Sequence, residues 1–152
     1  MQEDYTNWAK FGEEAFSVEQ LFGESWRNDL ANLLAAGREE SYDCEKRVIA
    51  AAASPEKVYF LKNGRVQMIA SDGSTNTYEA CPVCSPKVFG LVDVLSGTTS
   101  ADDIRTATRC VFDVIKADDI KQFLGQRPEL CFRLTQAVSS LCRHSVERLA
   151  NA

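Results

Sequence analysis

The stretch that decides the fold is Val88-Phe89-Gly90-Leu91-Val92-Asp93-Val94-Leu95-Ser96-Gly97. An apolar pair, Val88-Phe89, precedes Gly90, and the apolar run that follows ends at Ser96-Gly97. This order predicts a strand that stops at a glycine and passes directly into a short helix. The segments on both sides are therefore expected to supply partners for that strand.

The chain before this stretch is rich in strand signals. Residues 58–62 are rich in β-formers, and residues 65–70 alternate polar and apolar side chains. Asn63-Gly64 between them is a strong hairpin signal, because both central turn positions need φ > 0. Asp72-Gly73 predicts a second hairpin turn, from which residues 75–78 can pair back.

Helices are expected at both ends of the chain. Residues 1–17 are interpreted as an arm carrying Trp8, Phe11 and Phe16. Ser17 and Gln20 predict a capping box for the next helix, and Gly37 is expected to end that helical region as a left-handed C-cap. The run of four alanines at residues 50–53 favours helix locally over strand.

After a further strand at residues 111–115, two helices are expected. The first runs from residue 116 to Leu124 and stops at Gly125, and Pro128 begins the second. The last helix has a broad apolar face, formed by Leu130, Leu134, Ala137, Val138, Leu141, Cys142, Val146 and Leu149. That width predicts two contacts, one with the strands and one with a partner helix.

The order of these segments resembles the cyclic-nucleotide-binding domain of the catabolite activator and Fnr-type regulators. The resemblance rests on residues 59–66, on Phe89-Gly90 with residues 94–97, and on residues 127–130, and it covers residues 21–149. It implies an α+β fold with a helical segment, an antiparallel jelly-roll β-barrel (double-stranded β-helix) of about eight strands, and C-terminal helices.

The domain is expected to span residues 18–152, with the barrel at about 39–115 and the C-terminal helices at about 117–150. The family's transcription factors continue into a DNA-binding domain, whereas this sequence stops at Ala152, so the chain is expected to be either a stand-alone sensor domain or a piece of a longer protein. The last helix of the family packs against its twin in a dimer. The resemblance therefore implies a homodimer, here through Leu134, Val138, Leu141 and Cys142.

In the family, the loop and helix after Phe-Gly hold the ligand. A glutamate after the glycine binds the ribose 2′-hydroxyl, and a Pro-Arg pair further on neutralises the cyclic phosphate. In this register Leu91 takes the glutamate position and Thr99-Ser100 the Pro-Arg positions. The candidate pocket residues are Phe89, Gly90, Leu91, Val92, Thr99, Ser100, Ala101 and Arg105, and Arg105 would have to reach back from the incoming strand.

A buried phosphate needs charge-assisted donors, and each lost bond costs about 1.5–3 kcal/mol. We therefore predict that cAMP and cGMP do not bind in the usual way. Two alternatives stay open: a different small ligand in the same pocket, and a working cyclic-nucleotide sensor with a non-standard site. The cofactor is accordingly unassigned.

Cys81-Pro82-Val83-Cys84 is the motif with intrinsic chemistry. A CxxC pair can be structural, can cycle as a dithiol or form a disulfide, or can bind metal, here with a second subunit completing the ligands. Six cysteines in 152 residues favour reduced, mostly buried thiols over a disulfide scaffold. Cys131 and Cys142 are interpreted as small buried hydrophobes, with an inter-subunit thiol pair as the alternative.

Composition excludes several function classes. The net charge is −5, and the longest basic cluster is Lys46-Arg47, so direct nucleic-acid binding is not expected. The sequence has no apolar run long enough for a membrane span, and its acidic start does not fit a signal peptide, which indicates a cytoplasmic protein. No catalytic motif supports an enzyme. The sequence predicts a non-enzymatic regulatory sensor or interaction module, with a protein partner for its output.

Overall fold

The computed structural model describes residues 16–150 apart from Pro82 and Ala101, and within residues 141–150 it describes only part of the side chains. The helices are α2 (Val18–Phe22), α3 (Trp26–Asp29), α4 (Ala31–Ala36), α5 (Leu91–Ser96), α6 (Ala117–Gly125) and α7 (Pro128–Ala150). The strands are β1 (Phe16–Ser17), β2 (Arg38–Tyr42), β3 (Arg47–Ile49), β4 (Lys57–Asn63), β5 (Arg65–Ile69), β6 (Thr75–Glu79), β7 (Lys87–Phe89), β8 (Asp103–Thr106) and β9 (Cys110–Lys116).

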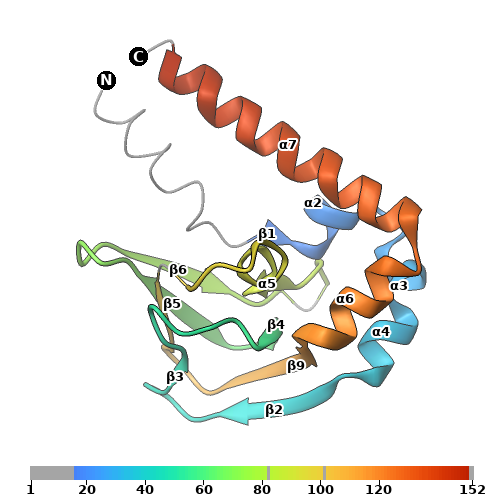
Figure 1. Cartoon of the computed structure of the whole chain (residues 1–152). Helices are drawn as coiled ribbons and strands as arrows, with labels where there is room; N and C mark the ends of the chain where they lie inside the picture. The colour runs from blue at the N-terminus through green and yellow to red at the C-terminus, as the bar shows by residue number, and fades with distance from the viewer. Residues whose placement is uncertain (1–15, 82, 101, 151–152) are drawn as a thin grey trace.

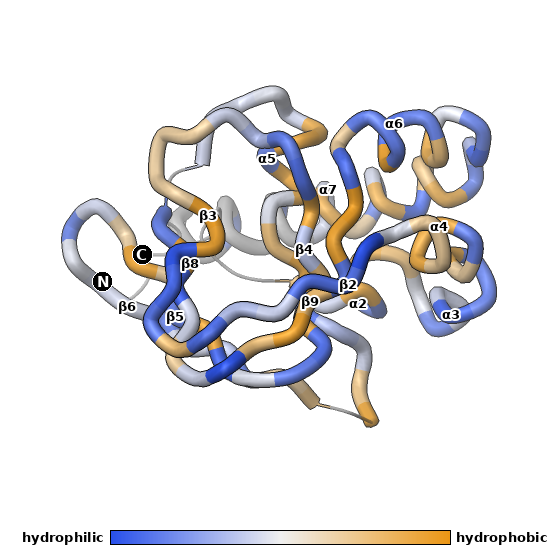
Figure 2. Tube along the Cα trace, turned by 90° about the horizontal axis from the view of Figure 1, so that it is seen from below, coloured by the Kyte–Doolittle hydropathy of each residue, from blue (hydrophilic) through white to orange (hydrophobic). Residues whose placement is uncertain are grey.

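The strands form two antiparallel sheets, with the orders β1-β7-β4-β9-β2 and β3-β8-β5-β6. Helices α3, α4 and α6 lie together at one end of the strands, and α7 runs across the molecule (Figure 1). Figure 2 shows the same grouping from below. The expected jelly-roll fold with helices at both ends is confirmed. A ninth strand appears because β1, two residues long, pairs with β7.

The prediction of a hairpin at Asn63-Gly64 is wrong. β4 pairs with β7 and β9, whereas β5 pairs with β6 and β8. The chain therefore crosses from one sheet to the other at Gly64, where φ is 97°. A Cβ here would lie 2.7 Å from Sγ of Cys110, so glycine is needed for space as well as for backbone conformation. The second expected hairpin is confirmed, because β5 and β6 pair across Gly73.

Two further local predictions are wrong. Gly37 has φ −74° and ψ 170°, which is extended backbone and not a left-handed cap. A Cβ at Gly37 would lie 3.1 Å from Ile115, so close packing on β9 explains the glycine. Residues 50–53 form a turn instead of a helix, with Ala52 at φ 66°. Tertiary contacts described below outweigh the weak helix propensity of alanine.

The start of α2 follows the sequence prediction. Ser17 accepts a hydrogen bond from the backbone N–H of Gln20, and the Gln20 side chain accepts one from the backbone N–H of Ser17, which together form a capping box. Trp8 and Phe11, expected in the N-terminal arm, lie outside the described residues.

Two apolar clusters make up the core. One lies between the strands and the helices and includes residues of α2, α3, α5, α6 and α7. The other lies between the two sheets and centres on Phe112, whose ring meets those of Tyr42 and Tyr59 edge-on. The β9 segment is coloured as hydrophobic in Figure 2, in agreement with its place in both clusters. Among the described residues, no helix is long and apolar enough to cross a membrane.

Candidate functional site

The candidate site begins where β7 passes into α5. Gly90 caps the helix in the left-handed region, with φ 89° and ψ −7°. A Cβ at Gly90 would lie 2.9 Å from the carbonyl oxygen of Lys57, so the backbone approaches β4 closely here. We call residues 89–100 the cassette. The glycine brings the start of the cassette against the neighbouring strand.

Helix α5 has one face buried in the protein and another face toward solvent. Leu91 and Val94 are 3% and 2% exposed and belong to the core cluster next to the helices. Val92 and Leu95 remain exposed. The position at which the family resemblance expects a ribose-binding carboxylate is therefore occupied by a side chain that is packed in the core.

Ser100 uses its polar groups within the protein. Its backbone N–H donates to the carbonyl of Ala53 at 3.2 Å, and its own carbonyl accepts from the N–H of Ala52 at 2.8 Å. Its hydroxyl donates to the carbonyl of Asp102 at 2.8 Å. Thr99 is exposed, and Ala101 lies outside the described residues. The alanine turn is thus bonded to the end of the cassette, at the position where the family's arginine would stand.

A groove of about 560 Å³ lies between α5 and the helices α6 and α7. Two smaller cavities lie beside Gly90 and Ser100 of the cassette. The larger has a volume of about 190 Å³ and lies between the cassette and residues 48–59. The smaller, of about 50 Å³, reaches toward Phe16 and Leu91. Ile49, Gly90, Asp93 and Ser100 line both. Small-molecule pockets typically measure roughly 300–1,000 Å³, so the larger cavity is below the usual size for a nucleotide-sized ligand.

Most of the charged residues that line the two cavities are acidic. Burial raises the pKa of the Asp93 carboxyl, which lines both. Asp102 is 4% exposed and lines the smaller cavity. Lys57 lines the larger one, but its ammonium lies 3.7 Å from a carboxylate oxygen of Glu40. A phosphate in this place would meet carboxylates and one cation that already has a partner.

Arg105 lies on β8 between Ile104 and Thr106, which are both buried. Because side chains alternate along a strand, Arg105 points to the opposite face, and it lines neither cavity. Phe89, in contrast, is buried and lines the smaller cavity together with Val92. The structure therefore gathers the cassette residues around the cavities and leaves Arg105 apart from them.

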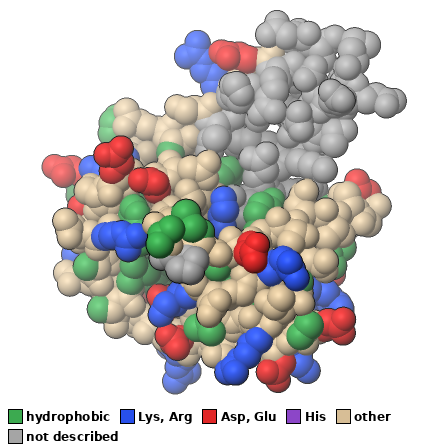
Figure 3. All heavy atoms as spheres, turned by 180° about the vertical axis from the view of Figure 1, so that it is seen from behind, with side chains coloured by type: hydrophobic (Ala, Val, Ile, Leu, Met, Phe, Trp, Pro, Cys, Tyr) green, Lys and Arg blue, Asp and Glu red, His purple; other side chains and the backbone are tan. Residues whose placement is uncertain are grey.

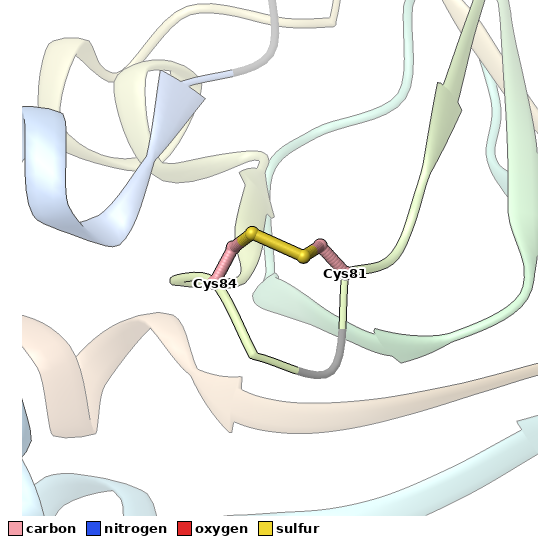
Figure 4. The surroundings of a disulfide bond; sticks show 2 residues. All are labelled: Cys81 and Cys84. Carbon is pink, nitrogen blue, oxygen red and sulfur yellow. A yellow bond between two sulfur atoms is a disulfide. The ribbon is translucent and has the colours of Figure 1, made fainter.

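Cys81 and Cys84 form a disulfide (Figure 4). The expectation of reduced, mostly buried thiols is therefore wrong for this pair. Cys44, Cys110 and Cys131 are free thiols as expected, but Cys44 and Cys131 are exposed, whereas Cys110 is buried. Exposure arises because Cys44 lies in a loop and Cys131 lines an open groove between α7, α5 and α6. Among the described residues, no group of three His, Cys, Asp or Glu side chains is placed to hold a metal ion.

The inner face of α7 packs on its own domain. Leu134 is 6% exposed and belongs to the core cluster next to the helices, and Val138 packs against that cluster. Leu134 is therefore packed within its own domain, Val138 is only partly buried, and the expected homodimer through this helix stays a prediction. The side chains of Leu141 and Cys142 lie outside the described part of the chain. Phe132, on another side of α7, is 64% exposed.

Sequence reasoning missed two parts of the site. The first is the turn at residues 50–53, whose bonds to Ser100 depend on the positive φ of Ala52, which alanine does not signal. The second is Asp93, which reads as an ordinary acidic residue in the first turn of a helix. Only the folded arrangement places its carboxylate at both cavities.

Comparison with known proteins agrees with this fold. A potassium channel of rice, AKT2, is 27% identical over 109 residues, which cover 72% of this chain and 13% of the channel. The N-terminal domain of a transcriptional regulator from Streptomyces coelicolor is 18% identical, with a TM-score of 0.67 over 86% of this chain and 91% of that one. The catabolite activator protein of Thermus thermophilus is 14% identical, with a TM-score of 0.68 over 86% of this chain and 62% of that one.

Residues 39–127 match the cyclic nucleotide-binding domain family. This range runs from β2 to just beyond α6 and includes both sheets except β1, together with the whole cassette. The chain belongs to the cyclic nucleotide-binding domain family.

Proposed function

We propose that this chain is a non-enzymatic regulatory module whose pocket does not hold cAMP or cGMP through the family's phosphate contacts. Family membership supports a regulatory role, as do the names of the similar proteins, a channel and a domain of a transcriptional regulator. The observation that carries the proposal is the hydrogen bonding of Ser100. Its N–H, carbonyl and hydroxyl all bond within the protein.

A cyclic phosphate placed at Ser100 would have to break these bonds and lie near Asp93. It would find no arginine among the residues that line the two cavities. Each missing charge-assisted hydrogen bond removes about 1.5–3 kcal/mol, and two such losses weaken binding by roughly two to four orders of magnitude. This energetic difference favours a module that acts through protein contacts.

Thermal unfolding with cAMP, cGMP and other cyclic nucleotides at millimolar concentration tests the proposal. We expect no shift in Tm. A ligand present at 100 times its Kd adds about 2.7 kcal/mol, which raises Tm by roughly 5–11 °C in a domain of this size. A saturable shift of that kind would contradict the proposal. A family member with an intact Pro-Arg pair, measured in parallel, shows that the assay detects binding.

We propose a protein as the partner that receives the output. The net charge of −5 opposes binding to a phosphate backbone. On the face shown in Figure 3, Lys and Arg side chains alternate with Asp and Glu side chains and do not gather into one basic area. Salt-dependent binding to DNA or RNA, measured by fluorescence anisotropy, would count against this assignment.

We also propose that the module dimerises through the outer side of α7. Phe132 supports this side, because a large apolar side chain that is 64% exposed gains from burial. Sedimentation velocity of the wild type and of Phe132→Asp tests the proposal, with a dimer expected for the wild type and a monomer for the variant. A wild-type protein that stays monomeric over a wide concentration range would overturn it.

A further inference from the structure

The disulfide closes a loop whose two ends have different surroundings. Cys84 is exposed, Cys81 is half-buried, and Val83 between them is 88% exposed. The N–H of Cys84 donates to the carbonyl of Cys81 at 3.1 Å, which makes the loop a tight turn. The sulfur of Cys84 is therefore the more accessible of the two to an external thiol.

The segment after Cys84 is bonded to the start of α2. The N–H of Glu19 donates to the hydroxyl oxygen of Ser85 at 3.2 Å, and the N–H of Val18 donates to the carbonyl of Pro86 at 2.9 Å. These are two of the first amides of α2, which have no partner within the helix. Residues 85–86, which directly follow the disulfide loop, thus bond two amides at the beginning of α2, beside the capping box of Ser17.

Helix α2 is in turn bonded to α7. Arg133 donates from Nη1 to the carbonyl oxygen of Phe22 at 2.8 Å and to Oδ2 of Asp29 at 2.9 Å. Val18, Leu21 and Phe22 are all buried in the cluster that also contains residues of α7. A continuous set of contacts therefore connects Cys84 with the last helix of the domain.

A surface groove gives access to the disulfide. It has a volume of about 370 Å³ and contains both cysteines together with the cation Arg27, while Lys62 in the same groove is paired with Glu39 and Asp113. Positive charge near a cysteine stabilises its thiolate, the form in which it leaves during thiol–disulfide exchange. Figure 4 shows the disulfide joining the two ends of its loop.

We propose that Cys81 and Cys84 form a reversible thiol–disulfide switch that controls how α2 packs against α7. The reductant is an external dithiol. Its thiolate attacks Sγ of Cys84, the Cys81–Cys84 bond breaks, and Cys81 leaves as a thiolate that takes up a proton. The second thiol of the reductant then attacks the reductant's first sulfur, which is bonded to Cys84 in the mixed disulfide. Cys84 is released as a thiolate and takes up a proton. Two electrons and two protons pass to the protein, and the dithiol becomes a disulfide.

Reduction acts on α2 because it removes the covalent restraint on the loop. With the bond intact, the Cα atoms of Cys81 and Cys84 are held 5.1 Å apart, which fixes the path of the chain into Ser85 and Pro86. Without it the loop has more conformational freedom, and the bonds to Val18 and Glu19 are made for a smaller fraction of the time.

Redox titration with peptide-level detection tests the first half of the proposal. The whole chain is equilibrated in mixtures of reduced and oxidised dithiothreitol, its thiols are alkylated, and the peptides are analysed by mass spectrometry. A Cys44→Ser/Cys131→Ser background removes the two free thiols that are exposed in the described part of the chain. We expect one reversible two-electron transition at Cys81 and Cys84. A pair that is fully alkylated in the oxidised mixture, or that resists excess dithiothreitol in the folded protein, overturns the proposal.

Hydrogen exchange measured by NMR tests the second half. On reduction, we expect exchange at the Val18 and Glu19 amides to become at least several-fold faster. The Ala70 amide, bonded to Ser74 at 2.9 Å in the β5–β6 hairpin, serves as the control and should not change. The Cys81→Ser/Cys84→Ser variant should match the reduced wild type. Unchanged exchange at Val18 and Glu19 would mean that the disulfide has no effect on α2, and the switch would be rejected.

Discussion

The carboxylate of Asp29 in α3 accepts a hydrogen bond from the guanidinium of Arg133 in α7, with 2.9 Å between Oδ2 and Nη1. Asp29 also accepts from the hydroxyl of Ser25 at 2.7 Å. The same Arg133 nitrogen bonds the carbonyl at the end of α2. One side chain therefore joins three helices, and its carboxylate partner is the group that makes this junction depend on pH.

The hydrogen bond from Ser25, followed by that from Arg133, holds the pKa of Asp29 below its ordinary value. Since the folded pKa is lower than the unfolded one, the ionised carboxylate stabilises the fold above about pH 4, and this contribution is lost as the pH falls further. Asp29→Asn should therefore lower Tm at neutral pH, and the difference from wild type should shrink below about pH 4. Differential scanning calorimetry across this range measures it.

Glu24→Gln is the matched control for Asp29→Asn, because Glu24 is an exposed carboxylate in the neighbouring loop. We expect it to change Tm little at any pH. If both variants behave alike, general charge effects account for the pH dependence and the junction at Asp29 does not.

Gly64 should tolerate alanine far less well than Gly73. Both have positive φ, 97° and 86°, so both variants place a side chain in left-handed backbone at a cost of about 1–2 kcal/mol. At Gly64 the new Cβ would also meet Cys110 and the backbone of Arg109, which adds about 1–3 kcal/mol. Nothing lies within 4 Å of the Cβ position at Gly73.

Chemical denaturation of Gly64→Ala and Gly73→Ala measures this difference directly. The free energy of unfolding should fall more for Gly64→Ala, because the two variants share the backbone cost and differ in crowding. Equal losses would show that the crossing between the sheets can relax, and that only backbone conformation selects glycine there.

The two glycine turns also show which features a sequence can predict. Both have the form of an Asx-Gly hairpin, and only Gly73 makes one. Whether Asn63-Gly64 forms a hairpin depends on which strands pair, and pairing partners such as β4 and β9 are about 50 residues apart in the chain. Local periodicity predicted the strands, the capping box of Ser17 and the short helix after Gly90, because these depend on neighbouring residues.

The site was predictable to a smaller extent for the same reason. The family register placed Leu91 and Ser100 at the cassette without showing that Leu91 is in the core. The bonds of Ser100 to the alanine turn join residues 47 and 48 positions apart. Neither composition nor spacing carries such information, and the contact between Ser85 and Glu19 of α2 joins residues 66 positions apart.

Introducing a glutamate at residue 91 should unfold the domain rather than restore nucleotide binding. Leu91 is 3% exposed in the core, and a buried charge without a partner costs about 3–5 kcal/mol. Val92→Glu, one residue further along α5, should cost about 1 kcal/mol or less, because Val92 is 40% exposed. Circular dichroism melts give both values. A stable Leu91→Glu protein that binds cAMP would contradict the core position of residue 91.

Asp93 should show the opposite pH dependence to Asp29. Burial raises its folded pKa, so the ionised carboxylate destabilises the fold at neutral pH, and this penalty disappears as the pH falls and both states become protonated. Asp93→Asn should therefore raise Tm at neutral pH, with an advantage that shrinks as the pH falls toward about 4 and is absent below it. Asp103→Asn is the control, since Asp103 accepts a hydrogen bond from the Ala51 N–H at 2.7 Å and its substitution should lower Tm. A lower Tm for Asp93→Asn at neutral pH would show that this carboxylate stabilises the cassette, and that the cavities accept negative charge more readily than we infer.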